Sequence, residues 1–113
     1  MRDDALLRRI LNYCTEIKED RERFGDSLDD FLGDQSYQRS CCMNLMQIGE
    51  TVNKLSYGFT EAHNEIDWIS VIGFRNLVAH RYEDLDSVRI WEIIVEHVPK
   101  LKLICESILA ESR

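Results

Sequence analysis

The chain has 113 residues, of which 44% are hydrophobic and 31% charged, and its formal net charge is −7. This length can bury a hydrophobic core without disulfide bonds, so we expect one domain over residues 1–113. The acidic balance excludes a broad basic face for nucleic acid, because such binding depends on neutralising phosphates. Any role with RNA would need a local positive site, and a basic protein partner is equally compatible with the charge.

The cysteine and hydropathy patterns argue against a zinc protein, a secreted protein and a membrane-spanning protein. The four cysteines form no CxxC pair and stand far from the histidines, which argues against a zinc site: Cys14, Cys41, Cys42 and Cys105. We expect them to be reduced and mostly buried. The chain shows no signal-peptide pattern and no apolar stretch of membrane-spanning length. A cytoplasmic protein with no membrane contact is therefore expected.

Hydrophobic periodicity predicts helices from the start of the chain. The first runs from about Asp3 to Arg23, with an apolar stripe at spacings of three and four: Leu7, Ile10, Cys14 and Ile17. Gly25 ends this helix, and Asp26 or Ser27 caps a short helical turn through Phe31 and Leu32.

The second long helix is predicted from about Asp34 to Leu55. Its stripe also alternates by four and three: Cys41, Leu45, Ile48, Val52 and Leu55. Gly49 lies inside this helix at a cost relative to alanine, which indicates close packing against another helix. The segment from Ser56 to Asp67 is polar and is expected to form turns.

A third helix is expected to begin after Asp67 as its N-cap and to end around Ala79 or His80. The fourth starts at Asp86 or Ser87 and carries another regular stripe: Trp91, Ile94, Val98, Leu101, Cys105 and Ile108. Pro99 predicts a kink or brief break near residues 97–98. Together these elements predict an all-α, up-and-down bundle of four long helices plus a short helical segment.

The run Gly73–Tyr82 concentrates side chains that can perform chemistry. Arg75 carries a permanent charge with a fork that fits phosphate, and His80 is an acid or base near neutral pH. On an ideal helix Asn76 and His80 share a face, whereas Arg75 points about 140° away from His80. Arg75 and His80 converge only if the helix ends at His80, if the arginine folds back, or across a symmetric dimer.

The ordered set of motifs resembles the HepT-like type of HEPN domain. Its signature is Arg-x4-His-x-Tyr, matched here by Arg75, His80 and Tyr82. Four further segments are similar to family elements: Gln47–Glu50 continuing to Asn53, Ile66–Trp68, Ile90–Ile93 and Val98–Leu101. Departures are mild: Thr51 replaces a common alanine, and Arg81 adds a positive charge beside the motif.

This resemblance implies a metal-independent endoribonuclease toxin that needs no cofactor, from a type VII-like toxin–antitoxin pair. Arg75, Asn76 and His80 would be its catalytic residues, and Arg81 a further contact to RNA phosphate. Tyr82 would accept AMP from a minimal nucleotidyltransferase antitoxin, which would block the site with bulk and negative charge. The resemblance also implies a homodimer with the motifs near the interface.

Two other interpretations remain open. The chain could be a non-catalytic HEPN binding partner of the nucleotidyltransferase, as its acidity suggests. Alternatively, it could be a structural helical dimer in which Arg75 pairs with one of the nearby carboxylates: Glu83, Asp84 or Asp86. Glu50 could face the motif or could only fill a polar gap between helices.

Overall fold

The structure is a computed structural model that describes residues 2–79 and 84–111. The described residues are almost entirely helical and contain no strand. The elements in chain order are α1 (Arg2–Phe24), α2 (Leu28–Leu32), α3 (Gln35–Val52), α4 (Tyr57–Ala62), α5 (Trp68–Ile72), α6 (Phe74–Ala79), α7 (Asp84–Glu92), the π-helical segment η1 (Ile93–His97) and α8 (Val98–Glu111). The prediction of an all-α fold is confirmed.

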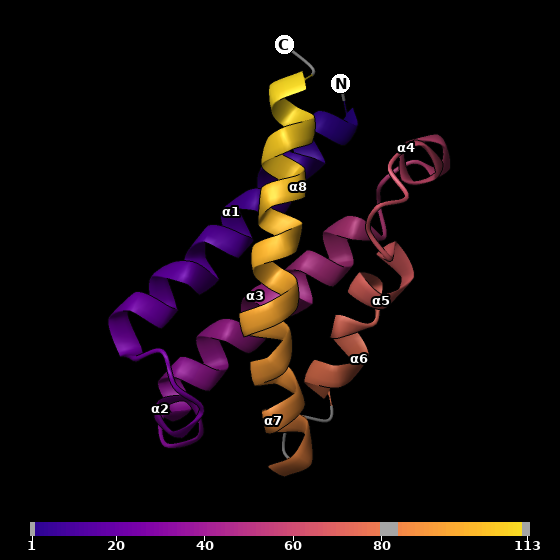
Figure 1. Cartoon of the computed structure of the whole chain (residues 1–113). Helices are drawn as coiled ribbons and strands as arrows, with labels where there is room; N and C mark the ends of the chain where they lie inside the picture. Colours follow the sequence, from indigo (N-terminus) through magenta and orange to yellow (C-terminus); the bar gives the residue numbers. More distant parts are fainter. Residues whose placement is uncertain (1, 80–83, 112–113) are drawn as a thin grey trace.

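The helices run up and down (Figure 1). Helix α1 descends, α3 returns beside it, α5 and α6 descend on the other side of α3, and α7 to α8 ascend. The start of α1 and the end of α8 therefore lie at the same end of the bundle. No described helix is both long enough and apolar enough to cross a membrane.

Three residues cap helix starts, and of these Ser27 and Asp67 were predicted as caps, whereas Asp34 was predicted only as the approximate start of a helix. Ser27, Asp34 and Asp67 are N-caps, and their side chains accept hydrogen bonds from the backbone N–H groups of Asp30, Tyr37 and Ser70. Each bond satisfies a donor that has no partner within its helix. Gly25, with φ of 115°, ends α1 as predicted.

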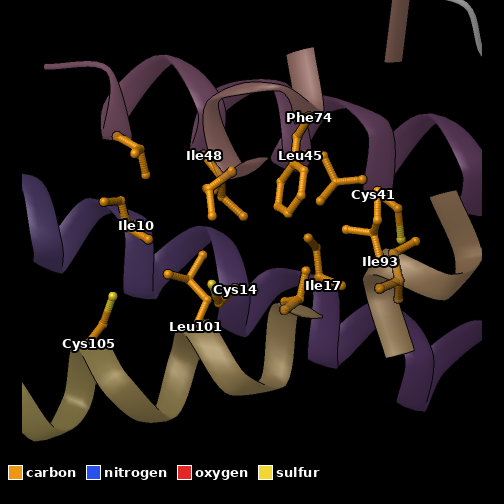
Figure 2. Packing of buried hydrophobic residues seen from close by; sticks show 14 of the residues in the cluster. Ile10, Cys14, Ile17, Cys41, Leu45, Ile48, Phe74, Ile93, Leu101 and Cys105 are labelled. Atoms are coloured by element: carbon orange, nitrogen blue, oxygen red, sulfur yellow. The ribbon is translucent and has the colours of Figure 1, made fainter. Parts of the chain in front are cut away.

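The apolar stripes of α1, α3 and α8 meet in one core (Figure 2). Ile10, Cys14, Cys41, Leu45 and Cys105 are fully buried there. All four cysteines are buried, as expected, and none of them forms a disulfide bond. Aromatic rings close one end of the core, where Phe24, Phe31, Tyr37 and Trp91 pack with centroid separations of 5.1 to 6.2 Å.

The prediction of turns over residues 56–67 is confirmed for residues 63–65 and wrong for residues 57–62, which form α4. Ser56 caps α4, and its side chain accepts a hydrogen bond from the N–H of Phe59. The backbone N–H and the hydroxyl of Ser56 donate to Asp3 at 3.0 and 2.8 Å. This contact spans 53 residues, so local periodicity could not reveal it.

Three helix boundaries also differ from the predictions. Helix α3 ends at Val52 rather than Leu55, and α7 begins at Asp84 rather than after Asp86 or Ser87. The predicted third helix is divided at Gly73 into α5 and α6. At this division the carbonyl of Gly73 accepts from the N–H groups of both Asn76 and Leu77.

The break expected near residues 97–98 takes the form of the π-helical segment η1. The N–H of Val98 donates to the carbonyl of Ile93, five residues earlier. Pro99 has no N–H, and its ring crowds the carbonyl four residues before it, so the preceding turn widens. The chain stays helical from Asp84 to Glu111 instead of separating into two helices.

Gly49 allows an unusually close contact between α3 and the junction of α5 and α6. A Cβ atom at Gly49 would lie 3.1 Å from the carbonyl oxygen of Ile72 and 3.4 Å from that of Val71. Both neighbours are backbone atoms, which cannot move aside as a flexible side chain can. The predicted close packing at this glycine is confirmed.

We predict that Gly49→Val lowers the free energy of unfolding by about 1 to 3 kcal/mol, since overpacking forces backbones apart. Urea denaturation followed by circular dichroism would measure the change. Gly58→Val is the matched control, because a Cβ atom at Gly58 in α4 meets nothing within 4 Å. Equal stability of the two variants would contradict the importance of this contact.

Candidate functional site

Helix α6 presents the first half of the motif to solvent. Phe74 and Val78 are buried on its inner face, at 5% and 6% exposure. Arg75 and Asn76 lie between them in sequence and are exposed. The four-residue spacing of the buried pair therefore turns the guanidinium and the amide outward.

The carboxylate of Glu50 in α3 pairs with Arg75. The distance from Glu50 Oε1 to Arg75 Nη1 is 3.2 Å, and the two side chains are 44% and 46% exposed. Glu50 follows Gly49 directly, and the Cβ position of Gly49 lies 3.5 Å from the backbone nitrogen of Arg75. The close packing of α3 thus brings this carboxylate to the motif.

Sequence reasoning left the role of Glu50 open, and the structure places it at the motif. The signal was Gly49, which indicated close packing and so marked its neighbour as near another helix. Among the described residues, Glu50 is the ion-pair partner of Arg75. The alternative partners proposed from sequence, Glu83, Asp84 and Asp86, have no described side chains.

The second half of the predicted site, His80 with Arg81 and Tyr82, lies outside the described residues. The described part brings together Arg75 and Glu50, with Asn76 beside them. The side chain of Asn76 is exposed and makes no hydrogen bond to another described residue. The guanidinium of Arg75 can bind an anion such as a phosphate diester.

Three of the four cysteines offer no competing nucleophile. Burial raises the pKa of the Cys105 thiol to about 12, and it also raises the pKa values of Cys14 and Cys41. A thiol acts as a nucleophile only as the thiolate, which these three groups do not form near neutral pH. Among the described residues, no group of three or more His, Cys, Asp or Glu side chains is arranged to hold a metal ion.

Comparison with known proteins gives a consistent picture. A family model described as "Ribonuclease HepT-like" matches residues 10–108. A candidate RNase of Caldanaerobacter subterraneus subsp. tengcongensis is 32% identical over 107 residues, covering 95% of this chain and 94% of the relative. A candidate RNase of Methanocaldococcus jannaschii is 28% identical over 87% of this chain and 88% of its own length.

A third relative, a candidate ribonuclease HepT of Thermococcus cleftensis, is 31% identical over 66% of this chain and 67% of its own length. No solved structure gives a significant match.

We predict that Arg75→Ala and Glu50→Ala each change the free energy of unfolding by less than about 1 kcal/mol, as expected for an exposed ion pair. The double variant should show a coupling energy of about 0.5 kcal/mol or less. Urea denaturation of the four proteins would measure this cycle. A loss above about 2 kcal/mol in Arg75→Ala would favour the structural interpretation of the motif.

Proposed function

This chain belongs to the HepT-like ribonuclease family, and we propose that it is a metal-independent endoribonuclease whose site is built on Arg75, Asn76 and His80. The observation that carries the proposal is the exposed guanidinium of Arg75, oriented by Glu50 on the outer face of α6. Family membership supports RNA as the substrate. The acidic chain would then apply its positive charge locally, at the motif, rather than over a whole surface.

In the proposed reaction the ribose 2′-oxygen attacks the adjacent phosphorus, and its proton passes to a base. The bond from phosphorus to the 5′-oxygen breaks, and that oxygen takes a proton from an acid. The products are a 2′,3′-cyclic phosphate and a free 5′-hydroxyl. His80 acts as acid or base, and in a dimer two copies divide these roles.

Arg75 and Asn76 stabilise the charge that develops on the phosphate oxygens, because both side chains donate hydrogen bonds. Arg81 adds a further contact to RNA phosphate. Glu50 biases the guanidinium toward the outer face of α6 before RNA binds, and the exposed pair is weak enough for a phosphate to replace the carboxylate. Glu50 is thus a positioning residue in this proposal.

A homodimer is part of the proposal, and exposed apolar side chains near the motif support it. Met43 is 68% exposed and Met46 39% exposed on α3, and Ile69 is 82% exposed on α5. Met46 precedes Glu50 by four residues, so the two share a helix face. A second copy covering these side chains would bring two motifs to one cleft.

The proposal includes regulation by a partner of the minimal nucleotidyltransferase type, forming a type VII-like toxin–antitoxin pair. AMP added to Tyr82 would place bulk and negative charge two residues from His80. The modification would then repel RNA phosphates from the site. The second candidate function is a non-catalytic binding partner of such a transferase, which the net charge of −7 favours.

We predict that the wild-type protein cleaves RNA with EDTA present, and that Arg75→Ala and His80→Ala each lower the rate at least 100-fold. The reason is that each removes charge stabilisation or proton transfer in the transition state. Gel analysis of a labelled RNA would measure the rates, and Arg9→Ala, an exposed arginine of α1, is the matched control.

Equal cleavage by wild type and His80→Ala would point to a contaminating nuclease and contradict the assignment of His80. No cleavage by wild-type protein whose Tyr82 is unmodified by mass spectrometry would favour the non-catalytic partner. Circular dichroism and light scattering should show the same helicity and assembly for all variants.

We predict that a cognate minimal nucleotidyltransferase with ATP adds AMP to Tyr82 and abolishes cleavage. Tyr82→Phe should remain unmodified and active, because it lacks the acceptor hydroxyl. Peptide mapping by mass spectrometry locates the added group, and Tyr57→Phe, which removes an exposed phenol on α4, serves as the control. If AMP were found on another residue and the transferase still abolished RNA cleavage by Tyr82→Phe, the assignment of Tyr82 would be rejected.

A further inference from the structure

A groove separates α5 and α6 from the long helix formed by α7, η1 and α8. Its cavity has a volume of about 430 Å³. Phe74 and Leu77 line it from α6, and these two residues lie on a different face of that helix from Arg75 and Asn76. The groove is therefore a feature of the motif helix that is separate from the site described above.

One wall of the groove carries positive charge. Arg89, His97 and Lys100 line it at spacings that keep them on one side of the helix, and all three are exposed. Arg89 pairs with Glu92 at 3.1 Å. No described carboxylate lies within ion-pair distance of His97 or Lys100. Among the described residues that line the groove, Lys100 is therefore the permanent cation without an ion-pair partner, and in a chain with a net charge of −7 it is available to an anionic ligand.

The acidic residues that line the groove, Glu65 and Asp67, lie at its other wall. Asp67 accepts hydrogen bonds from the backbone N–H and the hydroxyl of Ser70, as the cap of α5. Glu65 lies 3.8 Å from the imidazole of His63. Both carboxylates come from the segment that connects α4 to α5, so they lie across the groove from Lys100.

The floor of the groove is apolar. Phe74, Ile93 and Leu101 are buried there, and Leu77 and Ile104 are partly exposed to the cavity. Ile93 begins the π-helical segment and His97 ends it. The wide turn imposed before Pro99 thus lies directly against this floor, and such turns are frequent at functional sites.

We propose that this groove binds one nucleotide of single-stranded RNA, with its base against the apolar floor and its phosphate at Lys100. Cationic side chains that follow the backbone, beside an apolar surface for bases, are the usual means of binding single strands. The inference rests on the proposed function, because it makes the groove a subsite for a nucleotide flanking the cleaved bond. It also gives an acidic protein a second local contact for RNA.

The test is fluorescence anisotropy with a labelled 2′-O-methyl oligoribonucleotide, which cannot be cleaved because the attacking hydroxyl is blocked. We expect Lys100→Glu to weaken binding at least tenfold. Arg9→Glu makes the same charge change at an exposed position of α1 and should weaken binding less than twofold. Lys100→Ala should reduce the slope of log K against log salt by about 0.7, the value for one phosphate contact on a single strand. Lys100→Arg should keep both the wild-type affinity for RNA and the wild-type salt slope.

A separate variant tests the floor. Ile104→Trp fills the cavity without changing charge, and we expect it to weaken binding at least threefold with an unchanged salt slope. Circular dichroism and light scattering would show whether each variant keeps its fold and assembly.

Equal effects of Lys100→Glu and Arg9→Glu on RNA binding would contradict the proposal that the groove binds RNA. They would leave the nuclease proposal intact. Loss of RNA binding in Lys100→Glu, in a protein that never cleaves RNA, would support the groove and reject the nuclease. Unchanged RNA binding in Lys100→Glu, with loss of binding to an acidic peptide, would assign the groove to a protein partner instead.

Discussion

The close contact between α3 and the junction of α5 and α6 is the constraint on which the site depends. It requires Gly49, since a Cβ atom there would lie 3.1 Å from a backbone carbonyl oxygen. Because the two backbones approach so closely, the residue after the glycine reaches across to α6, and Glu50 pairs with Arg75. A glycine in the middle of a helix is unfavourable in isolation. Here it determines the position of Glu50, the only described counter-ion of Arg75.

Helix α6 contributes to both the motif site and the groove, because its residues lie on different faces of the helix. Phe74 and Val78 anchor it in the core, and this anchoring holds Arg75 and Asn76 outward. Leu77 turns toward the groove instead. The wall opposite Leu77 owes its shape to Pro99, which widens the turn at η1 without interrupting the helix. Backbone effects of one glycine and one proline thus shape both sides of a helix that is itself too short to be stable alone.

Much of this fold could be predicted from the sequence, because the signals are local. The stripes of α1, α3 and α8 and the caps at Ser27 and Asp67 follow from residue spacing and short-range hydrogen bonds. Helix α4 was missed because its start is supported by Asp3, 53 residues away. The pairing of Arg75 with Glu50 was not predictable for the same reason. Gly49 indicated close packing, but nothing in the spacing named the partner.

The exposure of the Glu50–Arg75 pair bears on how the site could exchange ligands. A buried ion pair would cost several kcal/mol to separate, because each charge would lose its partner in a medium of low dielectric constant. An exposed pair contributes only about 0.2 to 1 kcal/mol. With both side chains nearly half exposed, a phosphate can replace the carboxylate at Arg75 at little cost. The pair therefore orients the guanidinium while leaving it free for an anion, which a more deeply buried partner would prevent.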